Sequence, residues 1–81
     1  MLKVEGFDDC IIGIAQIWDK EHPVVVYDSG EMIEVLIAEH NMSREEAVEY
    51  FEFNIQGAYL GEYTPLYVAR CNPDFVIDLL H

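Results

Sequence analysis

Apolar residues recur in short stretches along this chain, and the spacing within each stretch predicts the element that it forms. The first stretch, Ile11–Trp18, fits a helical stripe as well as a strand. Gly13 is costly inside a helix, and the four isoleucines of the stretch favour a pleated surface, so we predict a strand. Its nearly unbroken apolar character predicts a central position in the sheet. Pro23 opens a second strand, Val24–Tyr27, and the polar turn between the two predicts an antiparallel hairpin.

A helix is predicted directly after the second strand. Asp28 and Glu31 have the spacing of a capping box, and Ser29 is a rival N-cap. The helix should end near His40 and Asn41, because asparagine adopts the left-handed conformation that closes many helices. Its apolar stripe consists of Met32, Ile33, Leu36 and Ile37.

The clearest local signal in the chain marks the start of the next helix. Ser43 and Glu46 have the spacing at which each side chain can bond the backbone amide of the other residue. We predict a helix from Arg44 to about Tyr59, with Gly61 just beyond its end. Its inner stripe consists of Ala47, Val48, Phe51, Ile55 and Ala58.

The C-terminal part of the chain predicts one more strand and a short helix. Thr64–Arg70 has the composition of a third strand, and Asn72 followed by Pro73 has the order of an N-cap and a first helical residue. The element order is β-β-α-α-β with a short final helix. The economical architecture is an α+β fold in which a small three-stranded antiparallel sheet packs against two helices. The final helix is amphipathic and presents Phe75, Val76, Leu79 and Leu80 on one side.

Length and composition indicate one folded domain, residues 1–81, in spite of a strong negative charge. Of these residues 52% are hydrophobic, which is more than a disordered acidic chain carries. Sixteen acidic residues against four basic ones give a net charge of −12. The bases are isolated along the chain, whereas a nucleic-acid binder needs clustered lysine and arginine, so we expect no direct nucleic-acid contact. A membrane surface is disfavoured for the same reason, and a partner with a basic surface is favoured.

The cysteines and the N-terminal sequence predict a cytoplasmic protein without a metal or cofactor. Cys10 and Cys71 belong to no metal-binding or redox spacing, and we expect both to be reduced, packed apolar residues. The N-terminal sequence lacks the apolar core of a signal peptide. No apolar run approaches the roughly 20 residues that cross a bilayer. We therefore expect the protein in the cytoplasm.

Several segments stand in an order that is characteristic of one family. The segments are Gly6–Asp9, Ile11–Gly13, Val24–Asp28, Glu45–Asn54 (EEAVEYFEFN) and Gly57–Pro65 (GAYLGEYTP). Over residues 6–68 the chain thereby resembles a family of small proteins encoded by tailed bacteriophages, cyanophages among them, for which no activity is established. The resemblance implies a phage gene product that works in the cytoplasm of a bacterial host, and it carries no catalytic residue over to this chain.

The outer face of the second helix is a candidate partner-binding surface. Glu45, Glu49 and Glu52 fall on this face, and Glu45 and Glu49 repel each other at the i, i+4 spacing. Glutamates also suit the start of a helix, so one interpretation is a solvated face. The other is a face that tolerates repulsion because it is kept for a basic partner.

A second candidate site lies around the end of the same helix. Asn54 is expected on or near the buried side, and a partly buried amide should be hydrogen-bonded. One interpretation is that Asn54 shapes the turn that follows. The other is that Asn54, Glu62 and Thr64 line a small polar site for a ligand or partner.

Three functions follow from these features. We favour a non-enzymatic phage accessory protein that binds a host or phage protein through its acidic surface, where it could occupy a nucleic-acid-binding groove as a mimic of DNA. The second is a small enzyme or ligand-binding protein that uses the polar set around Asn54 and Glu62. The third is an assembly component, a homodimer or larger oligomer, whose contacts would be made by Phe75, Val76, Leu79 and Leu80.

Overall fold

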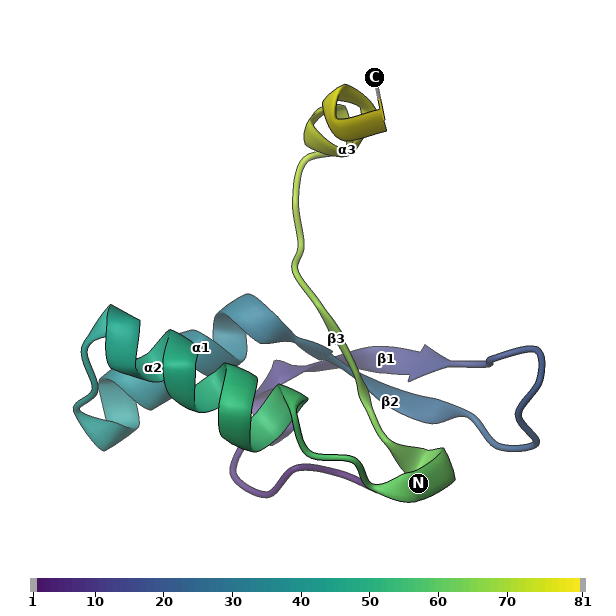
Figure 1. The fold of residues 1–81 in the computed structure, drawn as a ribbon, viewed down its shortest axis with the longest axis horizontal. Helices are drawn as coiled ribbons and strands as arrows, with labels where there is room; N and C mark the ends of the chain where they lie inside the picture. The colour runs from purple at the N-terminus through teal and green to yellow at the C-terminus, as the bar shows by residue number, and fades with distance from the viewer. Residues whose placement is uncertain (1, 81) are drawn as a thin grey trace.

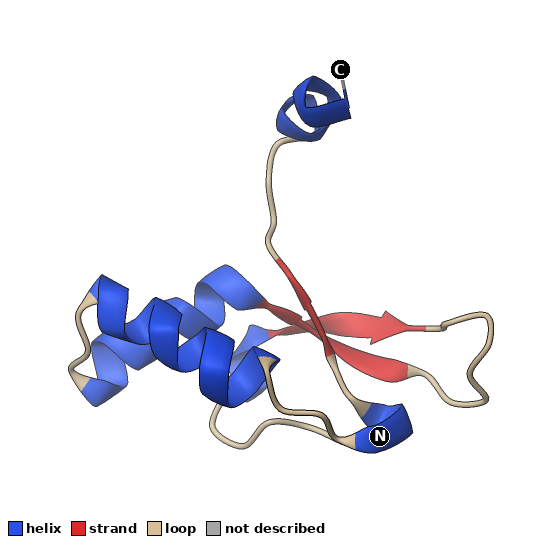
Figure 2. Cartoon of the chain, in the orientation of Figure 1, coloured by secondary structure: helices blue, strands red, loops and turns tan. Residues whose placement is uncertain are grey.

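The computed structural model describes residues 2–80, which form an α+β fold with a three-stranded sheet and two helices gathered at one end of it (Figures 1 and 2). Two short 3-10 turns precede the first and the last strand, at Asp8–Cys10 and Gly61–Tyr63. The strands are β1 (Ile11–Ala15), β2 (Val24–Asp28) and β3 (Leu66–Val68), and the helices are α1 (Ser29–His40), α2 (Arg44–Tyr50), which continues as a π-helical segment (Phe51–Gln56), and α3 (Pro73–Leu80).

The sheet has the order β1-β2-β3, and its two pairings differ in direction. β1 and β2 pair antiparallel, which confirms the predicted hairpin. β2 and β3 pair parallel, with Tyr27 opposite Tyr67, so the predicted fully antiparallel sheet is wrong. The reason is that Asp28 both ends β2 and caps α1, so no turn reverses the chain before the helix. α1 runs on past the end of the strand, α2 returns, and β3 therefore starts at the end of the sheet where β2 starts (Figure 1).

The prediction that Ile11–Trp18 forms a central strand is also wrong. β1 is an edge strand that ends at Ala15, and β2 lies between the other two strands. Ile14 is 63% exposed and Trp18, in the hairpin loop, is 94% exposed. The isoleucines correctly predicted a strand, but its position in the sheet depended on where β3 pairs, and a local pattern does not contain that information.

The predicted starts of α1 and α2 are confirmed. The Asp28 carboxylate accepts a hydrogen bond from the Glu31 amide at 3.1 Å, and Ser29, the rival cap, is instead the first residue of α1. Asn41 closes α1 with a left-handed φ of 55°. The capping box of α2 is complete. The Glu46 amide donates to Ser43 Oγ at 3.1 Å, and the Ser43 amide donates to Glu46 Oε1 at 2.9 Å.

The second helix ends earlier than predicted, and it ends as a π-helix. Regular helix from Arg44 passes into the π-helical segment Phe51–Gln56 and stops at Gly57, not near Tyr59. A Cβ atom on Gly57 would lie 2.9 Å from the Glu52 carbonyl oxygen and 3.0 Å from the Phe53 carbonyl oxygen. Gly57 is therefore required by the close approach of the wide last turn. π-helical turns are rare and often occur at functional sites.

The core lies between one face of the sheet and the inner sides of α1 and α2. Tyr27 is fully buried at its centre, and its hydroxyl accepts a hydrogen bond from the Val4 amide at 2.6 Å. Tyr67 of β3 stacks on Tyr27, and Phe51 meets Tyr67 edge-on with ring centroids 5.5 Å apart. The predicted stripes of both helices contribute to this cluster. The buried members are Phe7, Cys10, Val25, Tyr27, Met32, Leu36, Ala47, Phe51 and Ile55.

The C-terminal helix α3 stands away from the rest of the fold (Figure 1). The predicted cap is confirmed, since Asn72 Oδ1 accepts a hydrogen bond from the Asp74 amide at 2.9 Å. An extended segment, 69–72, joins β3 to the helix, and every residue of α3 is exposed. The third strand is shorter than the predicted Thr64–Arg70 because the chain leaves the sheet after Val68.

Candidate protein-binding face

The outer side of α2 and its π-helical continuation is held in a defined position at both ends. At its start, Arg44 bonds Glu34 of α1 at 2.7 Å, next to the capping box. At its end, Phe51 and Ile55 are buried in the core. The side that faces outward is therefore presented by an anchored element and not by a loose loop.

The three glutamates predicted as a partner-binding set lie together on this side. Glu45, Glu49 and Glu52 are all exposed and line one shallow hollow of about 500 Å³. Arg44, Val48 and Phe53 complete its lining. Among residues 2–80, no salt bridge involves any of the three glutamates.

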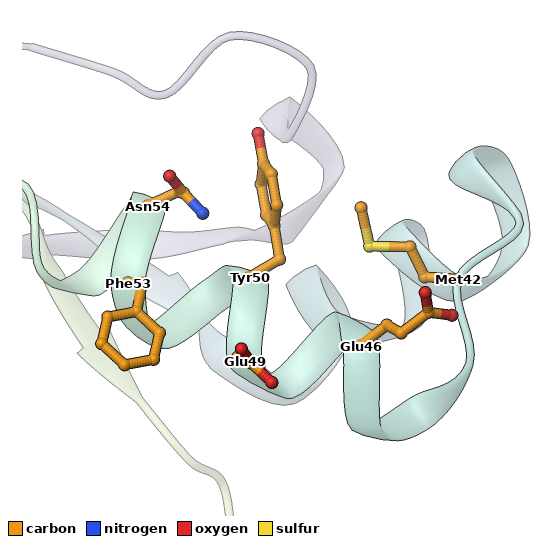
Figure 3. A pocket seen from close by; sticks show the side chains of 6 residues that line it. All are labelled: Met42, Glu46, Glu49, Tyr50, Phe53 and Asn54. Atoms are coloured by element: carbon orange, nitrogen blue, oxygen red, sulfur yellow. The ribbon is translucent and has the colours of Figure 1, made fainter.

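Two aromatic residues on this side were missed by the sequence analysis. Phe53 is 74% exposed and Tyr50 is 42% exposed. They line a second hollow of about 460 Å³, and Figure 3 shows Tyr50 standing between Met42 and Asn54. Phe53 and Glu49 line both hollows. A usable signal was present, because Phe53 is an aromatic residue off the apolar stripe of an amphipathic helix.

We call this surface the acidic–aromatic face and define it by Glu45, Glu49, Tyr50, Glu52 and Phe53. Most basic residues of the fold form ion pairs with other acids, and Arg44, which lines one of the hollows, bonds Glu34. Lys3 bonds Asp8 at 3.1 Å, and Arg70 bonds Asp28 at 3.0 Å. The Lys3–Asp8 hydrogen bond and charge pair raise the pKa of the lysine.

The members of the second predicted set lie on different elements. Asn54 is exposed, contrary to the expectation that it is partly buried, and it lines the hollows beside Tyr50. Thr64 shapes the turn after the helix, since its hydroxyl accepts from the Leu60 amide at 2.8 Å and donates to the Gly61 carbonyl at 2.7 Å. Glu62 is exposed in that turn. Neither Glu62 nor Thr64 lines the hollows that contain Asn54.

The two cysteines differ in their surroundings. Cys10 is buried, as predicted, and burial raises the pKa of its thiol above the usual value. Cys71 is exposed in the segment that leads to α3, so the prediction that both cysteines are packed is wrong for this one.

Within residues 2–80, histidine, cysteine and acidic side chains form no cluster of three or more that could hold a metal ion. No helix among these residues has the length and apolar character needed to cross a bilayer. Comparison of the chain with protein-family models, curated proteins and solved structures finds no match.

Proposed function

We propose that this chain is a non-enzymatic accessory protein that binds a basic protein surface through the acidic–aromatic face. The observation that carries the proposal is the exposure of Phe53, 74%, between glutamates that have no salt bridge within residues 2–80. An exposed aromatic ring beside hollows provides an anchor, and the surrounding charge selects the partner.

The chemistry of the face defines the partner. The glutamates attract lysine and arginine over a distance, while Tyr50 and Phe53 bury apolar area on contact. The partner therefore carries basic residues around an apolar patch. A nucleic-acid-binding groove is one such surface, and carboxylates would then take the place of phosphates. The resemblance to tailed-bacteriophage proteins supports a partner encoded by a bacterial host or by the phage.

The test compares two variants with the same change in net charge. In the first, Glu45, Glu49 and Glu52 are replaced by glutamine. In the matched control, Glu21, Glu31 and Glu62, which are exposed elsewhere, are replaced by glutamine. Proteins captured from a bacterial lysate by the wild-type chain should be retained by the control and lost with the first variant. Retention should also fall as salt rises, because exposed charges are screened over about 8–10 Å at physiological ionic strength.

A single substitution separates the aromatic anchor from the charge. Phe53→Ser leaves the net charge unchanged and should also abolish retention. Equal retention by both glutamine variants would contradict the proposal, because the location of the charge would then be irrelevant. If retention does not change with salt concentration, attraction between the glutamates and a basic partner is contradicted.

A further inference from the structure

A third hollow lies between the N-terminal segment, the end of α1 and the side of α2 that carries Tyr50. Its volume is about 570 Å³, within the range of roughly 300–1,000 Å³ that is typical of small-molecule sites. It is also more enclosed than the two hollows beside Phe53. We call it the Tyr50 cavity and define it by Glu5, Phe7, Leu36, Glu39, Tyr50 and Ile55.

The floor of the Tyr50 cavity is apolar and belongs to the folded core. Phe7, Leu36 and Ile55 line it, and they are only 8%, 2% and 6% exposed. They come from the N-terminal segment, α1 and the π-helical segment. A ligand in the cavity therefore contacts core side chains, and it must carry an apolar body to gain from that contact.

Contacts outside the cavity hold its N-terminal wall in place. The Val4 amide donates to the Tyr27 hydroxyl at 2.6 Å, which ties this segment to the centre of the core. Lys3 bonds Asp8 at 3.1 Å across the turn at Gly6, whose φ is 90°. The wall is therefore part of the folded structure, and the cavity is largely pre-formed, as small-molecule sites usually are.

The π-helical segment shapes the opposite wall. Asn54 and Ile55 follow Tyr50 by four and five positions, and all three line the cavity. In a regular α-helix of about 3.6 residues per turn, a side chain five positions further on points well away from the first. The wider π-helical turn, whose hydrogen bonds span five residues, brings it back to the same side. This rare turn therefore places an amide and a core side chain beneath one aromatic ring.

The rim of the Tyr50 cavity favours a positive charge. Glu5 and Glu39 are exposed there, and within residues 2–80 neither forms a salt bridge and no lysine or arginine lines the cavity. α1 ends at the same rim, at His40, and the carbonyl end of a helix attracts cations. The ring of Tyr50, 42% exposed and drawn between Met42 and Asn54 in Figure 3, offers a face that attracts cations too.

The lining suits neither a bare metal ion nor a lysine side chain. A hard cation takes about six or more oxygen ligands, and two carboxylates over an apolar floor do not provide them. The four-carbon stem of a lysine would fill only part of the volume of about 570 Å³. The lining fits a cation that carries a larger apolar body.

We propose that the Tyr50 cavity binds a small organic ammonium compound with an aromatic or branched aliphatic body. The body packs on the apolar floor, and the ammonium group donates hydrogen bonds to the carboxylates of Glu5 and Glu39 beside the Tyr50 ring. This binding goes beyond the proposed recognition of a basic protein. Of the residues that define the acidic–aromatic face, only Tyr50 lines this cavity.

An NMR titration of the full chain with phenethylammonium as the probe tests the proposal. The backbone amide signals of Gly6, Phe7, His40 and Asn54 should shift and saturate, while those of α3 should stay unchanged. Phenethyl alcohol, which has the same body without the charge, should bind at least about tenfold more weakly. Equal binding of the alcohol, or shifts that spread over the chain without saturation, would overturn the proposal.

A double variant tests where the charge acts. Glu5→Gln combined with Glu39→Gln should weaken binding of phenethylammonium by about five- to tenfold. The matched control, Glu21→Gln combined with Glu62→Gln, changes the net charge equally at exposed positions outside the cavity and should bind within about twofold of wild type. Equal weakening by both would show attraction by the net charge alone and would overturn the site.

The contribution of the Tyr50 ring has a separate pair of variants. Tyr50→Leu should weaken binding of phenethylammonium by about three- to tenfold, whereas Tyr50→Phe keeps the ring and should bind as wild type does. Thermal denaturation checks that each variant is folded. Unchanged binding by Tyr50→Leu would overturn the assigned site.

A further probe separates a small molecule from the side chain of a protein partner. Acetyl-lysine amide carries the same ammonium group without the bulky body, so it should bind more weakly than phenethylammonium. If it binds as tightly, the cavity takes a side chain of the partner and the proposal is overturned. If the wild-type chain binds no phenethylammonium, the proposal is overturned as well, while lysate capture through the acidic–aromatic face is unaffected.

Discussion

The α1–α2 region and α3 have the same kind of amphipathic pattern but opposite surroundings. Met32, Leu36 and Phe51 of the first region are buried within their own chain. Leu79 and Leu80 of α3 are exposed, and Figure 1 shows the helix apart from the sheet. Both begin at confirmed side-chain caps. The difference teaches that an amphipathic pattern predicts a helix and a need for an apolar surface, but not which chain supplies that surface.

The largest expected difference between the two regions concerns stability. Phe51→Ala should lower the free energy of unfolding by about 3–5 kcal/mol, because it leaves a cavity next to Tyr67. Leu79→Ala should leave the unfolding of the dilute monomer within about 0.5 kcal/mol of wild type, because its side chain is already exposed. Urea denaturation at low protein concentration measures both. Equal losses would show that α3 packs on its own domain.

A smaller effect is expected where the helical region ends. Gly57→Ala should lower the free energy of unfolding by about 1–3 kcal/mol, because the new methyl group meets the carbonyl oxygens of Glu52 and Phe53. The same variant should reduce capture of the basic partner, since Phe53 lies in the displaced turn. Thermal denaturation and lysate capture measure the two effects. A stabilised Gly57→Ala protein would mean that the last turn is regular helix.

The smallest expected effect lies at the capping box. Ser43→Ala should cost about 1 kcal/mol, the usual contribution of an N-cap side chain. The backbone amide of Ser43, with further help from its hydroxyl, lowers the pKa of Glu46 below its ordinary value of 4.5. A carboxyl whose pKa is lower in the folded state contributes stability above its unfolded pKa and loses it as the pH falls through the folded pKa.

Two glutamine variants test whether the stability that this cap contributes depends on pH. Glu46→Gln should be less stable than wild type near neutral pH, and the two should converge as the pH falls below 4.5, the ordinary value for this carboxyl. Glu52→Gln, which removes a glutamate without a cap contact, should show no such convergence. Denaturation curves between neutral and acid pH measure the free energy of unfolding of each variant. If the difference between Glu46→Gln and wild type is independent of pH, the charge of the Glu46 carboxylate does not contribute to the cap.

The acidic–aromatic face was predicted in part. The capping box marks where the helix starts, and helical spacing from that start places Glu45, Glu49 and Glu52 on one face. The aromatic half was missed, although helical spacing already places Phe51 on the inner stripe and Phe53 off it. The structure shows that Phe51 is buried and that Phe53 is 74% exposed. The polar set around Asn54 is divided between two elements. The helix ends at Gly57, so Glu62 and Thr64 belong to a separate turn.

The sequence by itself determined the features that depend on neighbouring residues. These are the caps at Asp28, Ser43 and Asn72, the hairpin of β1 and β2, and a charge distribution without a basic cluster. Each needs only residues a few positions apart, so a local pattern contains the necessary information. The tertiary structure alone decided that β3 pairs parallel to β2, that β1 lies at an edge, and that α3 is left without an apolar surface. These depend on long-range pairing and on the length of the connections between elements, because a short chain can close only those contacts that its connections can reach.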